Sequence, residues 1–153
     1  MSSRLFNEIR EKRGLAYYVS AGNSHYKDAG SLEVSAGLSV DKVLEGVKVI
    51  KDELEKVSQG KIPQAELFKA KEYLKGHLVL GVEGSRGAGS FLLLSELFED
   101  SSKTIEEVLA SIEAVTLEEV LAVAKDLFPP ENLNLAVIGP FPDESLFLEA
   151  LRV

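Results

Sequence analysis

The stretch SSRLFNEIREKRGLAYYVS, residues 2–20, decides how the chain begins to fold. Its first half carries apolar residues at helical spacing. Ser2 or Ser3 can cap a helix there, because a serine oxygen accepts a hydrogen bond from a free N–H of the first turn. Gly14 suits the left-handed position after a helix, and the residues beyond it are typical of a strand. The stretch therefore predicts a helix that ends at Gly14 and continues directly into a strand.

The same stretch holds the densest group of basic residues in the chain. Four of them lie close together: Arg4, Arg10, Lys12 and Arg13. The background is acidic, because 17 Lys and Arg against 25 Asp and Glu give a formal net charge of −8. This charge argues against binding nucleic acid through the whole surface. The favourable interaction of cations with the C-terminal end of a helix dipole explains such a cluster without any function.

A functional explanation involves Arg10 and Tyr17. An arginine donates charge-assisted hydrogen bonds to a carboxylate or a peptide carbonyl. Tyr17 follows just across the Gly14 turn, where its hydroxyl can donate to the same place. Such a pair would hold a peptide backbone or stabilise a developing oxyanion. On spacing alone, the solvated helix end and this binding role both stay open.

The rest of the chain predicts a hairpin followed mostly by helices. Residues 15–37 alternate like an antiparallel hairpin. Its two faces are expected to be Leu15, Tyr17 and Val19 inward, and Ala16, Tyr18 and Ser20 outward. Residues 133–139, LNLAVIG, read as a buried strand, and residues 141–153 as a C-terminal tail helix. Helices are expected over residues 40–58 (capped by Ser39), 63–80, 91–98, 105–113 and 117–128. The order indicates one α+β domain, residues 1–153, with helices packed on one face of an incomplete antiparallel sheet.

No complete catalytic apparatus is present in the sequence. The chain has no cysteine, which excludes disulfides, cysteine zinc sites and thiol catalysis. His25 and His77 lack a partner at metal-ligand spacing, so no metal site is expected. The glycine run at residues 81–89, GVEGSRGAG, is not a P-loop, and a kink or a close helix contact is the preferred interpretation. No stretch reaches the ~18–20 apolar residues of a membrane span, and a cytoplasmic location is the default.

Several long segments, in order, resemble the pitrilysin/insulinase-type zinc metallopeptidases, which include the mitochondrial processing peptidases. The segments are MSSRLFNEIREKRGLAYYVSAG (1–22), IPQAELFKAKEYLKGHLVLGVEGSRGAG (62–89), IEAVTLEEVLAVAKDLF (112–128) and LNLAVIGP (133–140). They are similar to the later part of the family's second domain, which lacks the zinc ligands. The resemblance implies a chain that is the C-terminal portion of a longer protein of processing-peptidase type.

The family resemblance also implies a function. The first, N-terminal domain of these peptidases usually carries His-x-x-Glu-His and a downstream glutamate, which together hold zinc and activate water. Their second domain supplies an arginine and a tyrosine to the substrate, and by motif position these are Arg10 and Tyr17. This chain is then expected to have no catalytic residue of its own and to bind no metal. It would be the substrate-binding part of a zinc-dependent endopeptidase whose zinc lies in the N-terminal domain.

An alternative is a non-catalytic structural or partner subunit of the same family, without a zinc site. The expected partners are the N-terminal half of the parent protein or a homologous catalytic subunit, and a peptide substrate. Neither nucleic acid nor a membrane is expected. A homodimer is a third arrangement, because a half-domain with an open sheet edge would need a partner.

Overall fold

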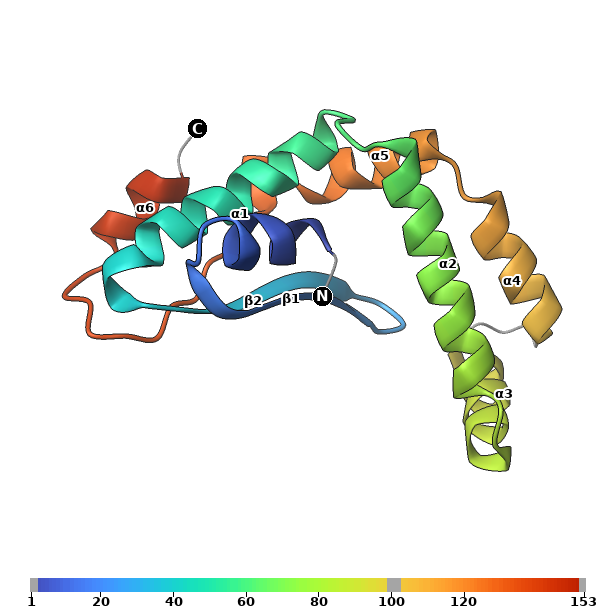
Figure 1. Ribbon diagram of the computed structural model, residues 1–153. Coiled ribbons are helices and arrows are strands. Elements are labelled where there is room, and N and C mark those ends of the chain that lie inside the picture. The colour runs from blue at the N-terminus through green and yellow to red at the C-terminus, as the bar shows by residue number, and fades with distance from the viewer. Residues whose placement is uncertain (1–2, 99–102, 152–153) are drawn as a thin grey trace. The chain divides into compact units, whose positions relative to one another are not determined.

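The computed structural model describes residues 3–98 and 103–151 (Figure 1). The described chain combines helices with a two-stranded antiparallel sheet, so the α+β class is confirmed. It divides into two compact units, Met1–Lys61 with Leu121–Val153 and Ile62–Val120. The expectation that residues 1–153 form one domain stays a prediction.

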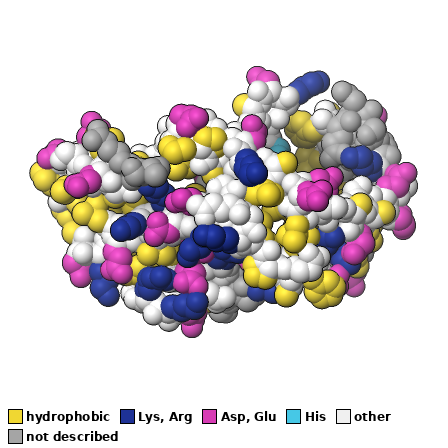
Figure 2. Space-filling model, turned by 90° about the horizontal axis from the view of Figure 1, so that it is seen from above, with side chains coloured by type: hydrophobic (Ala, Val, Ile, Leu, Met, Phe, Trp, Pro, Cys, Tyr) yellow, Lys and Arg dark blue, Asp and Glu magenta, His cyan; other side chains and the backbone are white. Residues whose placement is uncertain are grey.

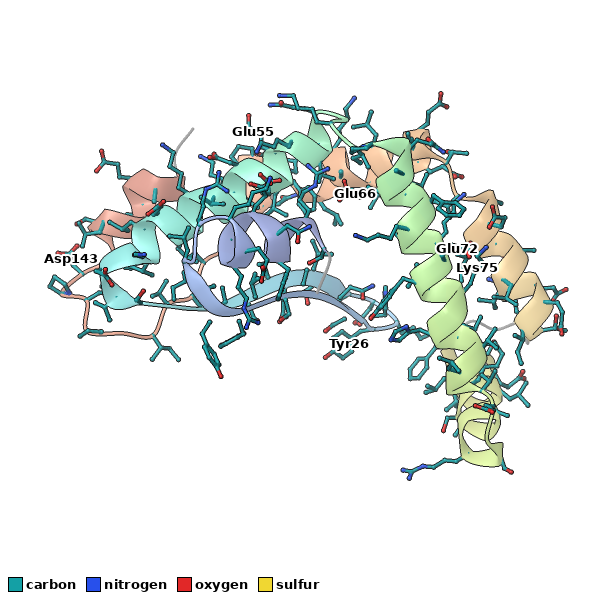
Figure 3. The ribbon with its side chains drawn as sticks, in the orientation of Figure 1. Tyr26, Glu55, Glu66, Glu72, Lys75 and Asp143 are labelled. Carbon is teal, nitrogen blue, oxygen red and sulfur yellow. The ribbon has the colours of Figure 1, made fainter. Side chains whose placement is uncertain are left out.

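The predicted hairpin is present in the first unit. Strands β1 (Ala16–His25) and β2 (Gly30–Leu38) pair in antiparallel register, with Val19 opposite Ala36 and His25 opposite Gly30. The turn is closed by a hydrogen bond of 2.9 Å from the Tyr26 N–H to the Ala29 carbonyl oxygen. Tyr26 therefore lies at the tip of the ribbon (Figure 3).

A β-bulge corrects the expected faces of β1. Ala16 pairs with Leu38 and Tyr18 pairs with Gly37, so two residues of β1 span one step of β2 and Tyr17 is the extra residue. Ala16 is buried in the core, whereas Tyr17 is 86% exposed. The prediction that Tyr17 shares the inward face was wrong, because a bulge changes the phase of the alternation along the strand.

The predicted first helix is present, but most of it is wound as a π-helix, η1 (Phe6–Glu11). The Lys12 N–H reaches back five residues to the Asn7 carbonyl oxygen at 2.9 Å, which is the π-helical bond. Ser3 caps the first turn, because its hydroxyl oxygen accepts a hydrogen bond of 3.3 Å from the Phe6 N–H. Gly14 follows with a φ of 58°, the left-handed position predicted for it.

The core of the first unit lies between the ribbon, η1 and α1 (Val43–Ser58), as Figure 1 shows. Ile9 of η1 is completely buried. Around it pack residues of the N-terminal helix, of the ribbon and the residue just before it, and of α1: Leu5, Leu15, Ala16, Val19, Leu38, Val49 and Ile50. A short 3₁₀ turn, η2 (Val40–Lys42), leads into α1. Ser39 makes no side-chain capping bond, so that expected cap is wrong.

An ion pair inside the first unit ties its N-terminal segment to α1. Glu53 of α1 is 3% exposed and accepts from Arg4 at 3.5 Å and from Lys56. Arg4 also donates to the Lys61 carbonyl oxygen at 2.8 Å, just beyond the glycine that ends this helix. Because the carboxylate is buried, removal of its cations would leave an uncompensated charge.

The C-terminal part of the first unit contains the end of α5 (Leu117–Leu127), η3 (Pro130–Asn132) and α6 (Ser145–Leu151). The two prolines after α5 stop that helix as predicted, and the tail helix is present as α6. Helix α6 lies against α1. Its buried Phe147 meets Phe141 edge to face, with ring centroids 5.0 Å apart.

The buried strand predicted over residues 133–139 is absent. Within the described ranges this segment pairs with no strand, and the backbone N–H groups of residues 134–139 donate to no backbone carbonyl. The side chain of Ile138 is fully exposed. A strand needs a neighbour to accept its ladder of hydrogen bonds, and in the described residues β1 and β2 pair only with each other.

The second unit is helical. It contains α2 (Gln64–Gly81), α3 (Ser85–Phe98), α4 (Ile105–Ala114) and the start of α5. Lys75 of α2 donates to Glu113 of α4 at 2.8 Å and also pairs with Glu72 on its own helix (Figure 3). The two capping boxes predicted from sequence are confirmed. Thr104 exchanges hydrogen bonds with Glu107, and Thr116 does so with Glu119.

The chain leaves α2 after Gly81 and enters α3 at Ser85, so the break lies inside the glycine run at residues 81–89, for which a kink or a close helix contact was the preferred interpretation. A Cβ added to Gly87 would overlap the carbonyl oxygen of Gly81 and lie 3.0 Å from its carbonyl carbon. Only a residue without a side chain lets the first turn of α3 approach the end of α2 this closely. Helix α3 begins at Ser85, six residues earlier than the sequence predicted.

Apolar side chains stay at the surface of the second unit. On α3 five of them are more than half exposed: Leu92, Leu93, Leu94, Leu97 and Phe98. Across the face of the molecule in Figure 2, hydrophobic side chains lie among charges of both signs. A helix that is apolar on most sides is usually buried in the complete, assembled protein.

Candidate functional site

Arg10 lies on the surface of η1 with its guanidinium over an aromatic ring. Its Cζ is 5.1 Å from the centroid of the Phe6 ring, within the range of a cation–π contact. Arg10 is exposed, whereas Phe6 is partly buried. Among the residues that the structure describes, Arg10 forms an ion pair with no carboxylate. Its hydrogen-bond donors therefore face solvent.

Glu8 forms ion pairs with the two basic residues that follow Arg10. Its carboxylate accepts from Lys12, and from Arg13 at 2.7 Å, while its carbonyl oxygen accepts a second bond from Arg13 at 2.8 Å. The hydrogen bond from Lys12, and next that from Arg13, lower the pKa of Glu8 from 4.5 to about 2. Lys12 and Arg13 are thus paired with a carboxylate of their own helical segment.

The π-helical winding contributes to this separation of charges. Residues 8 and 13 are five apart, and in an α-helix at 100° per residue they would be about 140° apart around the axis. A bond that closes at i+5 brings such residues to the same side. The basic cluster predicted from sequence is therefore divided, with Arg13 against Glu8 and Arg10 against Phe6.

Tyr17 extends from the bulge of β1 and is the most exposed tyrosine described. Its neighbour Tyr18 packs across the ribbon on Gly37, because a Cβ at Gly37 would overlap the Tyr18 ring. No hydrogen bond or ring contact joins Tyr17 to Arg10 in the described structure. Both lie in the first unit on consecutive elements, and both are accessible to a ligand.

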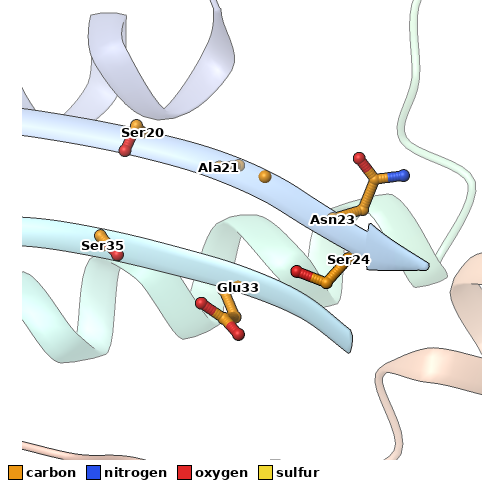
Figure 4. Close-up of a pocket in the computed structure, with 7 residues that line it drawn as sticks. Ser20, Ala21, Asn23, Ser24, Glu33 and Ser35 are labelled. Carbon is orange, nitrogen blue, oxygen red and sulfur yellow. The ribbon is translucent and has the colours of Figure 1, made fainter. Parts of the chain in front are cut away.

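A shallow pocket on the ribbon was not found from sequence. It has a volume of about 200 Å³ and is lined by small and polar residues of both strands, among them Ser20, Ser24, Glu33 and Ser35 (Figure 4). Glu33 accepts a hydrogen bond of 3.0 Å from Ser31. The signal in the sequence is the serine or glycine at every second position from Ser20 to Ser24, opposite Ser31, Glu33 and Ser35.

The two histidines do not form a metal centre in the described residues. His25 lies beside Asn23, with 2.6 Å between the His25 Nε2 and the Asn23 Nδ2. His77 lies on Tyr73, with ring centroids 4.1 Å apart. Within residues 3–98 and 103–151, no three His, Asp or Glu residues converge as metal ligands. The described residues therefore do not offer a ligand set for a zinc ion. In the same ranges no helix is long and apolar enough to cross a membrane.

Comparison with known proteins links the sequence to a family of peptidases. Residues 1–74 match the family profile described as the peptidase M16 inactive domain. An uncharacterized zinc protease of Mycobacterium bovis is 41% identical over 152 residues, which are 99% of this chain and 34% of that protein. The uncharacterized zinc protease YmxG of Bacillus subtilis is 36% identical over 140 residues, or 92% of this chain and 34% of that protein.

Solved structures agree with this fold. A conserved protein from Enterococcus faecalis has a TM-score of 0.71 at 34% identity, and the match covers 80% of this chain and 28% of that one. A protease from Helicobacter pylori has a TM-score of 0.68 at 23% identity, over 82% of this chain and 30% of that one, which is a likeness of fold. The present chain spans about a third of the length of the curated relatives it matches.

Proposed function

Because the chain belongs to the M16 family of zinc metallopeptidases, of which it carries part of the inactive domain, we propose that it is the substrate-binding part of a zinc-dependent endopeptidase. In this proposal Arg10 and Tyr17 bind the peptide near the bond that is cleaved. The relatives named zinc proteases are about three times as long as this chain. Hydrolysis is therefore a property proposed for the whole protein.

The observation that supports Arg10 and Tyr17 is that each lies in a local irregularity of the backbone. Arg10 is in the π-helix η1, and Tyr17 is the extra residue of the β1 bulge. Such irregularities are frequent at functional sites, where they turn a side chain away from its regular direction. The bulge leaves Tyr17 86% exposed while Ala16 is buried, and this exposure is compatible with a role in binding.

The chemistry of the pair suits a peptide backbone. A guanidinium presents several N–H donors in a fixed plane, and the phenol adds one O–H donor. Donors already in place where negative charge develops stabilise the transition state of acyl transfer more than the ground state. With Lys12 and Arg13 held by Glu8, Arg10 is the member of the basic cluster with donors available for this role.

Zinc is proposed for another part of the whole protein, because the described residues of this chain do not fit it. The proposed partner is the N-terminal half of the same protein or a homologous catalytic subunit. The exposed leucines of α3, and residues 133–139, which pair with no strand, support a partner. Both present surfaces that complete, assembled proteins usually cover.

The test is hydrolysis of a peptide by the whole protein carrying Arg10→Ala or Tyr17→Phe. Removing one donor to a developing oxyanion costs about 10²–10³ in kcat, and we expect the Arg10 variant to fall in this range. Lys12→Ala and Tyr18→Phe are the matched controls, and each should stay within a few-fold of wild type. Full activity of Arg10→Ala would refute the proposed role.

The alternative is a partner subunit that contributes Arg10 and Tyr17 to an active protein and has no zinc site of its own. The residues upstream of this chain in the gene product distinguish the two. A His-x-x-Glu-His motif with a downstream glutamate supports the endopeptidase. Without that motif, Arg10→Ala should lower the activity of the partner in the assembled complex.

A further inference from the structure

We propose that Phe6 is a positioning residue, which holds the Arg10 guanidinium in place for the substrate. The proposal rests on the substrate-binding role of Arg10 proposed above. The observation that carries it is the 5.1 Å separation between the Arg10 Cζ and the centroid of the Phe6 ring.

Phe6 is a suitable platform because it is itself held. Its side chain is partly buried on η1, and its backbone N–H donates to the Ser3 hydroxyl oxygen at 3.3 Å. An exposed arginine loses rotamer freedom when it binds a ligand, which costs affinity. A ring beneath the guanidinium restricts those rotamers before the ligand arrives. The binding cost is then lower for the same hydrogen bonds.

The ring holds the cation without consuming its donors. A carboxylate partner would occupy the N–H groups of Arg10, as Glu8 occupies those of Arg13. A cation–π contact attracts the charge to the face of the aromatic ring and uses no acceptor atom, so Arg10 keeps N–H groups for a ligand. The basic residues therefore have different partners. Glu8 pairs with Lys12 and Arg13, whereas Phe6 restrains Arg10 and leaves its hydrogen-bond donors available.

The test uses the whole protein with Phe6→Leu, Phe6→Tyr, Arg10→Ala and the double variant Phe6→Leu/Arg10→Ala. A cation–π contact at an exposed site corresponds to a change of about two- to fivefold. We expect Phe6→Leu to lower kcat/KM by this factor and Phe6→Tyr, which keeps the ring, to restore it. In the Arg10→Ala background, Phe6→Leu should have no further effect, because the guanidinium it acts through is gone.

The outcomes distinguish the positioning role of Phe6 from the substrate-binding role of Arg10. If Arg10→Ala is impaired and Phe6→Leu is normal, the positioning role is wrong and the role of Arg10 stands. If Phe6→Leu impairs activity equally in both backgrounds, its effect is structural and the positioning role is wrong. If Arg10→Ala is normal, both proposals fall.

A second measurement is independent of activity. In the whole protein, protons on the Arg10 side chain should resonate upfield because of the Phe6 ring current. Phe6→Leu should remove that shift and Phe6→Tyr should keep it. An Arg10 spectrum unchanged by Phe6→Leu overturns the contact itself, whatever the enzyme assay gives.

Discussion

Glu8→Gln should destabilise the first unit in a way that depends on pH. The pKa of Glu8 is lowered from 4.5 to about 2, chiefly by the hydrogen bond from Lys12 and then by that from Arg13. A pKa difference of about 2.5 corresponds to at most about 3.4 kcal/mol. The side chains of Lys12 and Arg13 are 64% and 38% exposed, so water screens the pair. We therefore expect about 1 kcal/mol at pH 7.

The sign of the pH dependence follows from the lowered pKa. The folded state favours the ionised carboxylate, so its contribution is complete above pH 4.5 and is lost as the pH falls toward 2. Urea unfolding followed by far-UV circular dichroism, at pH 7 and at pH 2.5, measures the free energy of unfolding. The gap between wild type and Glu8→Gln should shrink strongly at the lower pH.

Glu11→Gln is the matched control for this experiment. It makes the same change in charge on the same helix, and Glu11 is exposed and forms no ion pair in the described structure. Its effect should be smaller at pH 7 and similar at both pH values. A Glu8→Gln gap that is equal at pH 7 and pH 2.5, or no larger than that of Glu11→Gln, would refute the reasoning.

Three further predictions concern the rest of the chain. Gly87→Ala should lower the stability of the second unit by about 1–3 kcal/mol or more, because the added Cβ would overlap the backbone of Gly81. Gly89→Ala is the control, since a Cβ there meets nothing within 4 Å, and it should leave the stability unchanged. Thermal unfolding measures the stability of both variants. Backbone amides of residues 134–139 should exchange hydrogen much faster than those of α1 in mass spectrometry, and equal protection would contradict their unpaired state. Thr104→Ala should cost about 1 kcal/mol in urea unfolding through loss of the α4 cap, and Thr104→Ser should recover most of it.

Features that depend on near neighbours in the chain were predictable from sequence. The capping boxes at Thr104 and Thr116 require only a spacing of three residues, and both are present. The left-handed glycine at residue 14 and the hairpin likewise follow from short-range chemistry. The presence and type of most helices were correct for this reason.

The positions at which a helical turn or a strand pair contains one extra residue were not predictable from the sequence. The π-helix and the bulge each add one residue to a repeat, and the pattern of apolar residues does not record where. That is why Tyr17 was assigned to the inward face with Val19, while Ala16 took that place. The strand at residues 133–139 failed for another reason, since its pattern is strand-like but pairing needs a partner strand.

The candidate site was predictable only in part. Arg10 and Tyr17 were named by the family resemblance, because spacing alone left their role open; the structure leaves both accessible, and their binding role stays a prediction. The contact of Arg10 with Phe6 and the pocket beside Glu33 depend on side-chain packing and strand register, which sequence spacing does not fix. Which residues lie near a site is therefore easier to infer than how they are held.

The bulge at Tyr17 makes this position suitable for a chemical probe. Its side chain is outside the alternation of β1 and packs on nothing that the fold requires, so a photoreactive amino acid can replace it with little loss of stability. Light would then attach residue 17 covalently to whatever lies opposite it in the assembled protein. Mass spectrometry of the product would identify that neighbour directly, whether it is a bound peptide, the rest of the chain or another subunit.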